Sequence, residues 1–407
     1  MASLPLEGVR VLELGNYIAA PTAGRLLADF GAEVIKVERP GTGDELRRWR
    51  LYDGDTSMLY RTINRNKKSI TLDLSSEAGR AAVVDLVEHC EVLLENFRPG
   101  TLERWGIGPE RLTEVNPDLV VARISAFGQT GPLAQQPGFA AVAEAYGGLR
   151  ALVGEEDRPP SRVGVSIGDS IAGLYAAFGV VMRLFERTRT PGLPASTPID
   201  VALHEAVFSM MESLIPDYSA FGVLRQRVGG RMEGIAPSNA YTCADGTGVI
   251  IAGNGDSIFR RLMHLIDRAD LADDEELGEN AGRWRRRDEL DDAIGAWAAT
   301  LPAEEALRRL DEAGVPAGPV LTAADIAADA QYAARRMVQR FDVSIGARTL
   351  EGVQFPGVVP VLDKTSVPVR SLGPDLGEHT TEVLSGLLGM SRGQIDAAAS
   401  RSVRKSA

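Results

Sequence analysis

An aspartate at the start of a long apolar helix is the residue best placed to do chemistry in this sequence. The stretch 163–187 begins as a short alternating apolar run, breaks at Gly168-Asp169 and continues with apolar residues at helical spacing. Asp169 is the single acidic residue between positions 161 and 182. Because Asp is a favoured N-cap residue, its carboxylate could simply accept a backbone N–H of the first turn. A carboxylate held beside a glycine at a helix start could instead be a nucleophile or a base.

Basic side chains recur in three loops that adjoin predicted strands. These are Arg39 in the first loop, Arg65, Lys67 and Lys68 in the second, and Arg98 and Arg104 in the third. Ligands of open parallel sheets collect in the loops beyond the carboxyl ends of strands. A solvated face explains any one of these cations, but their repeated placement after strands favours an anionic ligand with several phosphates.

The elements that must position these residues form a Rossmann-like α/β fold. Residues 9–14 read as a buried strand, a helix runs to about Phe30, and residues 32–38 read as a second strand. A strand, a helix and a strand within some thirty residues predict a βαβ unit, and hence a parallel sheet with a right-handed crossover. Further strands are expected at 92–95 and 119–124.

This unit lacks the signature of a dinucleotide-binding protein. The loop 15–24 does not have the G-x-G-x-x-G spacing, and Glu38, where an acidic ribose ligand is expected, is followed at once by Arg39 and Pro40. An NAD-dependent oxidoreductase is therefore not favoured.

The length, composition and charge of the chain narrow the classes of protein to which it could belong. The 407 residues exceed one ordinary core, with 44% hydrophobic and 25% charged residues as in other globular proteins. A net charge of −12 argues against nucleic-acid binding as the main function. Cys90 and Cys243 are too few for a disulfide framework, which fits a reduced, cytoplasmic setting, and no secretory signal or membrane-spanning run is expected. The four histidines stand far apart, so we expect neither a metal site nor a Ser-His-Asp arrangement.

Changes of composition along the chain predict two domains. Residues 1–222 form the amino-terminal part of a large domain, and 223–237 are a polar, glycine-bearing linker. A smaller α+β domain is expected over 238–325. Residues 326–407 comprise a second linker and a return to the large domain.

Six segments, taken in order, resemble the class III CoA-transferase family, which includes formyl-CoA transferase, carnitine CoA-transferase and α-methylacyl-CoA racemase. They are LEGVRVL at 6–12, AEVIKVERPGTGD at 32–44, NRNKKSITLD at 64–73, ENFRPG at 95–100, FGQTGP at 127–132 and GDSIAG at 168–173. The resemblance covers nearly the whole chain. It implies a Rossmann-like large domain built from both chain ends, a smaller domain, and two subunits interlocked as a homodimer.

The same resemblance implies a site. The family's catalytic aspartate falls on Asp169. Its CoA contacts fall on Ile18, Ala19, Arg39, Leu72, Ser75, Asn96, Phe97, Arg98, Arg104, Pro137 and Phe139. The implied substrates are acyl-CoA and a small carboxylic acid, exchanged through an aspartyl-CoA thioester, with no tightly bound cofactor, no nucleic acid and no membrane partner.

Two other activities stay open at this point. A racemase or epimerase of 2-methylacyl-CoA needs two acid/base groups around the α-carbon, and the family's racemases place a His-Asp pair where this sequence has Phe139-Ala140. A non-catalytic CoA-ester-binding protein would not need Asp169. Ala140 and Glu144 depart from the common transferase pattern. Arg227 and Arg231, in a glycine-bearing segment, favour a carboxylate acceptor, with succinyl-CoA as donor and a dicarboxylate as acceptor.

Overall fold

The computed structural model describes residues 4–54, 56–190, 197–346, 348–362 and 367–400, which fall into two units. The first unit holds the described residues of Met1–Leu149, Val163–Glu212 and Ala330–Ala407. The second holds Arg150–Arg162 and the described part of Ser213–Asp329. Each unit has its own hydrophobic core.

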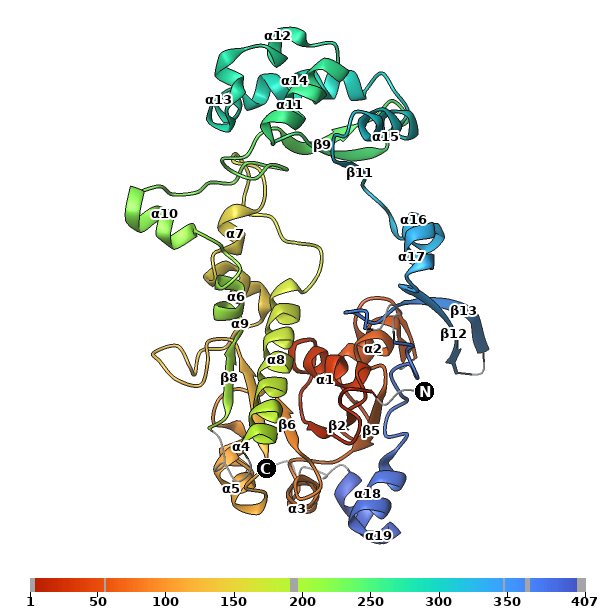
Figure 1. Cartoon of the computed structure of the whole chain (residues 1–407). Helices are drawn as coiled ribbons and strands as arrows, with labels where there is room; N and C mark the ends of the chain where they lie inside the picture. Colours follow the sequence, from red (N-terminus) through yellow and green to blue (C-terminus); the bar gives the residue numbers. More distant parts are fainter. Residues whose placement is uncertain (1–3, 55, 191–196, 347, 363–366, 401–407) are drawn as a thin grey trace. The chain divides into compact units, whose positions relative to one another are not determined.

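A six-stranded parallel sheet forms the centre of the first unit (Figure 1). Its strands are β1 (Arg10–Glu13), β2 (Glu33–Glu38), β5 (Lys67–Thr71), β6 (Val92–Glu95), β7 (Val120–Ser125) and β8 (Ile199–Ala202). They lie in the order β5-β2-β1-β6-β7-β8, and every neighbouring pair is parallel. This is the strand order of a doubly wound sheet. In such a sheet the order in which the chain adds strands switches from one side to the other, here between β1 and β6. The predicted Rossmann-like fold is confirmed.

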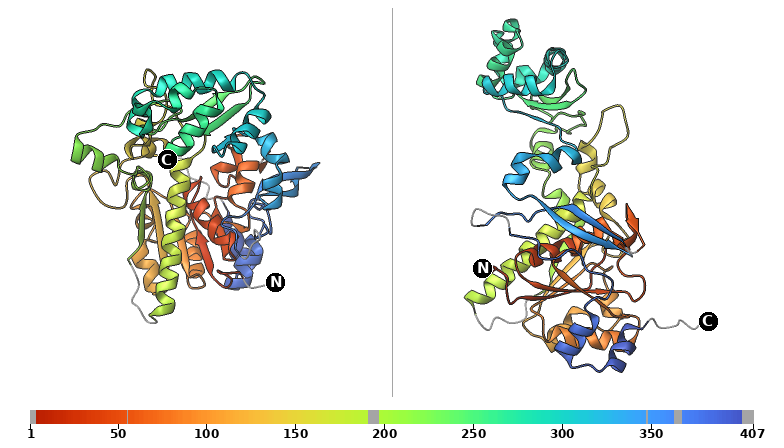
Figure 2. Two further views of the ribbon diagram at one scale, coloured as in Figure 1. Left: turned by 45° about the horizontal axis from the view of Figure 1, so that its top comes forward. Right: turned by 90° about the vertical axis from the view of Figure 1, so that its right-hand side faces the viewer.

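Helices cover both faces of this sheet, because side chains alternate between the faces along each strand. Val11 of β1 packs into one core and its neighbour Leu12 into the other. The first core includes α1 (Ala19–Asp29), α6 (Ala140–Tyr146), α8 (Ile167–Arg189) and α9 (Leu203–Phe208). The second includes α3 (Glu77–Val87), α4 (Thr101–Arg104), α5 (Pro109–Val115), α18 (Thr380–Leu388) and α19 (Arg392–Ala399). The two helical layers are seen on opposite sides of the sheet in Figure 2.

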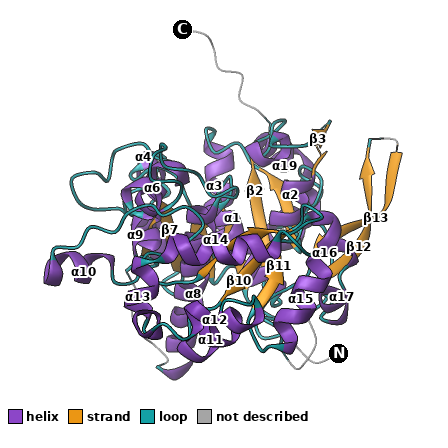
Figure 3. Cartoon of the chain, turned by 90° about the horizontal axis from the view of Figure 1, so that it is seen from above, coloured by secondary structure: helices purple, strands orange, loops and turns teal. Residues whose placement is uncertain are grey.

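The carboxyl-terminal part of the chain returns to the first unit, as predicted. The backbone N–H of Asp73 donates to the carbonyl of Ala398 at 2.9 Å. The Arg47 guanidinium donates to the carbonyl of Pro374 at 3.1 Å. The returning segment also forms the antiparallel hairpin of β12 (Val338–Ile345) and β13 (Arg348–Pro356), which stands at the rim in Figure 3. Shorter elements of this unit are η1 (Glu45–Arg48), β3 (Tyr52–Asp53), β4 (Thr56–Ser57), α2 (Met58–Ile63) and α17 (Ala330–Ala334).

The second unit is a small α+β structure. An antiparallel sheet in the order β11-β10-β9 (Ala317–Pro319, Gly248–Ala252, Ser238–Thr242) buries Val249 and Ile251 against helices. The helices are α10 (Leu214–Phe221), α11 (Asp256–Leu265), α12 (Ala269–Ala272), η2 (Glu275–Gly278), α13 (Asn280–Arg285), α14 (Arg287–Ala298), α15 (Ala303–Glu312) and α16 (Ala323–Ala328). The short helix α7 (Leu149–Leu152) lies at the boundary of the two units.

The limits of the two units differ from the domain limits expected from sequence. Residues 150–162, which the sequence assigns to the large domain, and 213–237 both belong to the second unit. They do so because they bind each other. The N–H of Gly229 donates to the carbonyl of Gly154 at 3.1 Å, and the Arg227 guanidinium donates to the carbonyls of Glu155, Glu156 and Arg158.

Helix α8 corrects the expectation that no apolar run could span a bilayer. In the described part of the chain it is the one helix long and apolar enough to cross a membrane, judged by length and composition alone. One side of the helix belongs to the core of the first unit, where Ala172, Ala176 and Val180 are fully buried. Core helices of globular proteins satisfy the same criteria, so this length and composition assign no membrane role.

Candidate functional site at the carboxyl edge of the parallel sheet

The point between β1 and β6, where the strand order of the sheet switches, brings two predicted binding segments together. The loop after β1 ends at Ile18, which is followed by Ala19 as the first residue of α1, and the loop after β6 carries Asn96 and Phe97. The N–H of Asn16 donates to Oδ1 of Asn96 at 2.9 Å, and Nδ2 of Asn96 donates to the carbonyl of Asn16 at 2.7 Å. The two loops are therefore joined at the place where doubly wound sheets bind ligands.

Asp169 lies in the first turn of α8 but does not cap it. The helix begins at Ile167 with Ser166 as its N-cap, so Asp169 is the third helical residue. The N-cap interpretation was wrong, because the helix starts three residues earlier than an N-cap at Asp169 requires. The carboxylate is half-buried and still lies where the partial positive charge of the helix terminus stabilises an anion.

Two glycines fix the surroundings of Asp169. A Cβ on Gly173 would lie 2.6 Å from the carbonyl oxygen of Ala19 and 2.8 Å from Cβ of Thr22, so α8 crosses the first turn of α1 in direct contact. A Cβ on Gly168 would lie 3.3 Å from Cγ of Glu144 on α6. Since residues four apart share a helix face, Asp169 stands one turn from the amino end of α1.

The loop before α1 is held by a buried network of charges. Nζ of Lys36 donates to the carbonyl of Gly15 at 2.7 Å and lies 2.8 Å from Oδ2 of Asp44, and both side chains are fully buried. Oδ1 of Asp44 accepts the N–H of Tyr17 at 3.1 Å. Burial lowers the pKa of Lys36, but the charges of Asp44 and Glu13 outweigh burial and raise it, so the amine stays charged. The network fixes both ends of the turn that leads into α1.

Within this turn Tyr17 adopts a left-handed backbone conformation with φ of 63°, which is uncommon for a residue other than glycine. Its ring contacts Trp49, with centroids 5.2 Å apart, and Phe139, with centroids 5.8 Å apart. Phe139 is 66% exposed. These rings form an aromatic wall beside the loop. Sequence reasoning missed Tyr17 and Trp49, because no local pattern shows that they meet Phe139.

The predicted cations divide into two groups. All three of one group are exposed: Arg39 in the loop that follows β2, Arg98 in the loop that follows β6, and Arg104 at the end of α4. Arg39 lies 3.6 Å from Glu45, and Arg104 donates to the hydroxyl of Thr101 at 2.9 Å. These three side chains are positioned to meet an anion at the carboxyl edge.

The other predicted cations do not belong to this group. Arg65 pairs with Asp29 at 2.7 Å and Lys67 with Glu13 at 2.7 Å, all four side chains being buried, while Lys68 pairs with Glu33 at 2.7 Å. They were wrongly placed beyond a strand end, since β5 starts at Lys67 and these residues are at its amino end. Burial lowers the pKa of Lys67 to about 8 in spite of Glu13.

The remaining predicted contacts lie at the same edge with different accessibility. Leu72 and Ser75 follow the carboxyl end of β5. The side chain of Leu72 belongs to the core, whereas Ser75 is exposed and bonds to Asp73 through its N–H and its hydroxyl. The side chain of Ile18 is buried, so only its backbone and that of Ala19 can face a ligand. Pro137 is exposed just before Phe139.

Glu38, the expected ribose ligand of a dinucleotide-binding protein, is fully engaged within the chain. Its carboxylate accepts hydrogen bonds from Arg47, Tyr60, Ser69 and the N–H of Asp44. Burial raises the pKa of Glu38, but the hydrogen bonds and charge of Arg47 outweigh it and lower the value to about 2. With its oxygen atoms occupied, this carboxylate has no capacity left for a ribose.

In the second unit, Arg227 and Arg231, which were expected to bind a carboxylate substrate, already bind groups of their own unit. Arg231 pairs with Asp288 at 2.8 Å and Asp291 at 2.6 Å. Arg227 donates to backbone carbonyls. Both guanidinium groups anchor the segment to its own unit, which removes the reason for assigning them to an acceptor acid.

Comparisons with known proteins show which family of proteins this chain is similar to. Residues 6–380 match the sequence model of CoA-transferase family III. The chain is 44% identical over 388 residues to the succinyl-CoA–D-citramalate CoA-transferase of Chloroflexus aurantiacus, covering 95% of this chain and 94% of that protein. It is 33% identical to the succinate–glutarate CoA-transferase of Agrobacterium fabrum, covering 94% and 96%. A crystal structure of a CAIB/BAIF family protein from Brucella suis superposes with a TM-score of 0.82 at 33% identity, covering 95% and 100%.

Replacing Gly173 by alanine is expected to destabilise the large unit by about 1–3 kcal/mol, because the new methyl group meets the backbone of α1, which cannot move aside as a flexible side chain can. Urea denaturation measures the change. Gly164→Ala is the matched control, since a Cβ there meets nothing within 4 Å. Equal stability of the two variants would contradict the close crossing of α8 and α1.

Replacing Glu38 by glutamine is expected to cost about 3–5 kcal/mol, because it leaves the buried Arg47 without its counter-charge. The pKa of Glu38 is lower in the folded than in the unfolded protein, so its contribution is present above pH ~4.5 and is lost as pH falls toward 2. The variant should therefore lose less stability than the wild type between these pH values. Unfolding free energies measured across this range check the prediction, and parallel pH profiles would refute it.

Proposed function

Because the chain belongs to CoA-transferase family III, we propose that this enzyme moves CoA between carboxylic acids with Asp169 as its nucleophile. As a CoA-transferase it uses CoA thioesters as substrates. The observation that carries the role of Asp169 is its place in the first turn of α8, where Gly173 brings that turn against the amino end of α1. The residue thus faces the edge of the sheet at which ligands bind.

In the proposed mechanism one carboxylate oxygen of Asp169 attacks the thioester carbonyl of the donor. The C–S bond breaks, which gives a mixed anhydride and the CoA thiolate. The thiolate then attacks the aspartyl carbonyl, forming an aspartyl-CoA thioester and releasing the donor acid as its carboxylate. An incoming carboxylate reverses both steps, leaves as the new acyl-CoA and restores Asp169. No net proton is taken up or released, and the energy of the thioester bond is conserved.

The helix termini supply the stabilisation that this chemistry needs. Neither Ile18 at the start of α1 nor Ser166 at the start of α8 makes a side-chain capping bond. Backbone N–H groups of a first turn have no acceptor within their own helix, and an oxyanion is a suitable partner. The need for a second acid/base group, as in a racemase, does not arise, and the apolar Phe139 cannot provide one.

For the CoA thioester itself, we propose binding by the residues gathered at the carboxyl edge. Arg39, Arg98 and Arg104 would meet the phosphates. Ser75, Asn96 and the backbone of Ile18 and Ala19 would line the path toward Asp169, with Pro137 and the wall of Tyr17, Trp49 and Phe139 beside it. Leu72 supports this edge from the core.

The names of the relatives suggest the acids that are exchanged. The Chloroflexus protein is named for succinyl-CoA and D-citramalate, and the Agrobacterium protein for succinate and glutarate. We propose succinyl-CoA as donor and a dicarboxylate as acceptor, in a reduced, cytoplasmic setting. Cys90 and Cys243 are buried free thiols, which suits such a setting.

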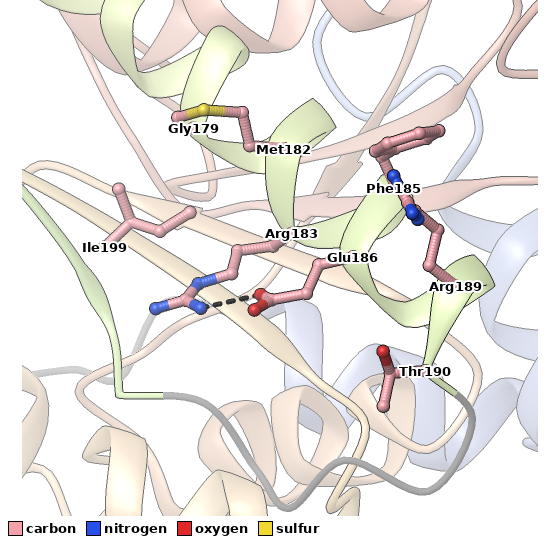
Figure 4. Close-up of a pocket in the computed structure, with 8 residues that line it drawn as sticks. All are labelled: Gly179, Met182, Arg183, Phe185, Glu186, Arg189, Thr190 and Ile199. Carbon is pink, nitrogen blue, oxygen red and sulfur yellow. Dashed lines mark hydrogen bonds and ion pairs between the residues drawn. The ribbon is translucent and has the colours of Figure 1, made fainter.

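The solvent side of α8 supports assembly into a homodimer. Leu174, Phe178, Val181, Met182 and Phe185 are between 41% and 60% exposed along this helix. An apolar face of this size is unusual on a monomer. At its far end the face continues into a pocket of about 760 Å³ lined by Met182, Phe185 and Ile199, in which Arg183 and Glu186 form an ion pair (Figure 4). We propose that a second copy of the chain covers this face, in the interlocked arrangement of the family.

Asp169→Asn is expected to abolish exchange of labelled succinate into succinyl-CoA, by at least ~10³-fold, because an amide is no nucleophile for a thioester. Hydroxylamine added to the wild type with succinyl-CoA should give a hydroxamate at residue 169, read by mass spectrometry. Glu304→Gln, which removes an exposed acid from the first turn of α15, is the control. Full exchange in the Asp169 variant would exclude the nucleophile, and CoA binding without any exchange by the wild type would favour a binding protein.

Phe178→Glu combined with Phe185→Glu is expected to produce a folded monomer, because two charges on the apolar face of α8 prevent its burial. Light scattering after size-exclusion chromatography gives the mass, and circular dichroism verifies folding. A dimer of unchanged stability would show that this face is not the interface.

A further inference from the structure

Next to the point where the strand order of the sheet switches, a buried arginine forms ion pairs with two carboxylates. Glu95 ends β6, and Arg123 of β7 is its partner in the parallel ladder. Nε of Arg123 donates to Glu95 at 2.6 Å, and its two terminal nitrogens donate to Glu103 at 2.7 and 3.3 Å. The Arg123 side chain is 8% exposed and that of Glu95 fully buried, so this arginine cannot itself reach a ligand in solution.

The two carboxylates hold opposite ends of one loop. The other oxygen of Glu95 accepts the N–H of Phe97 at 2.6 Å. Glu103 belongs to α4, a single turn that follows Gly100, which has a left-handed backbone conformation with φ of 81°. A helix of one turn does not hold itself together. Arg123 is thus the shared anchor of the first and last parts of the segment 96–104.

This segment carries two of the cations proposed to bind phosphate. Arg98 and Arg104 are both exposed, and a terminal nitrogen of Arg104 would lie 3.2 Å from a Cβ on Gly100. Long exposed side chains have many rotamers, so where their guanidinium groups can bind depends on the backbone that bears them. That backbone is fixed through Glu95 and Glu103.

We propose, on the basis of the proposed function, that Arg123 is a positioning residue for recognition of the CoA phosphates. It acts through Glu95 and Glu103 on the loop that presents Arg98 and Arg104, and it touches neither the acyl group nor Asp169. Only arginine suits this role, because its planar fork can donate to two carboxylates in different directions, whereas the single ammonium group of lysine cannot span both.

The burial of the group agrees with this role. Burial raises the pKa of Glu95 despite the charge and hydrogen bond of Arg123. A carboxylate so far from water stays in place as an acceptor for Phe97 only while a cation lies beside it. By contrast Glu103 is 44% exposed, so its removal leaves a folded protein and tests the anchor of α4 separately.

The test compares two donors in the wild type and in two variants, Arg123→Lys and Glu103→Ala. Exchange of labelled succinate is measured with succinyl-CoA and with the succinyl thioester of pantetheine, which has the same reacting group without the nucleotide phosphates. Both variants should raise KM for succinyl-CoA about tenfold or more, the effect of losing hydrogen bonds to charged groups. Their kcat with succinyl-CoA, and their kcat/KM with the pantetheine ester, should stay within about twofold of the wild type.

Arg61→Lys serves as the matched control. Arg61 is also a buried arginine that binds a carboxylate and a carbonyl, those of Asp375 and Gly373, but it lies outside the loop. It should leave the ratio of the two donors unchanged.

Three outcomes would overturn the inference in different ways. Equal losses with both donors would make Arg123 a purely structural residue and leave the function intact. A wild type without preference for the CoA ester would exclude phosphate recognition at this loop. A wild type without exchange would overturn the proposed function, and the role of Arg123 with it.

Discussion

The structure of the site depends on a buried lysine. The ammonium group of Lys36, a residue of β2, lies among Glu13, Asp44 and the carbonyl of Gly15 and is out of contact with water. A charge in such a place is costly unless it is fully paired, and removal of one partner leaves the others uncompensated. The network therefore contributes little net stability compared with an apolar core. What it provides is a single position for the turn that ends in the strained Tyr17 and begins α1.

This turn determines the position of the proposed nucleophile through a close backbone contact between α1 and α8. The carbonyl of Ala19 lies where a side chain on Gly173 would be, so the position of α1 sets the position of α8, and with it that of Asp169. A second charged group works in parallel: Arg123 fixes the loop after β6 as Lys36 fixes the loop after β1. Both loops leave the sheet where its strand order switches, and hydrogen bonds between Asn16 and Asn96 connect them. Each of the two loops is therefore anchored by a buried cation.

Which of these features could be predicted from the sequence depends on how far apart along the chain the interacting residues lie. The parallel sheet, the place of Asp169 near a helix start and the place of Arg39 directly after a strand rest on local patterns, and the structure bears out these placements. Arg65 and Lys67 look like the other cations in sequence, yet they pair with Asp29 and Glu13, residues far away along the chain. No spacing rule reveals such a pair. The same holds for the aromatic wall, and for residues 150–162, whose partners lie some seventy residues further on.

The two sides of α8 have different tasks, which explains its unusual composition. The side toward the sheet is made of small residues, and Gly173 and Ala176 let the helix lie against α1 and the core. The other side presents Phe178 and Phe185 to solvent within a single chain. A large exposed apolar face on a protein surface commonly marks an interaction site. The helix that carries Asp169 thus has one buried side of small residues and one exposed apolar side, and the proposed homodimer would bury the second side of the same helix that carries the proposed nucleophile.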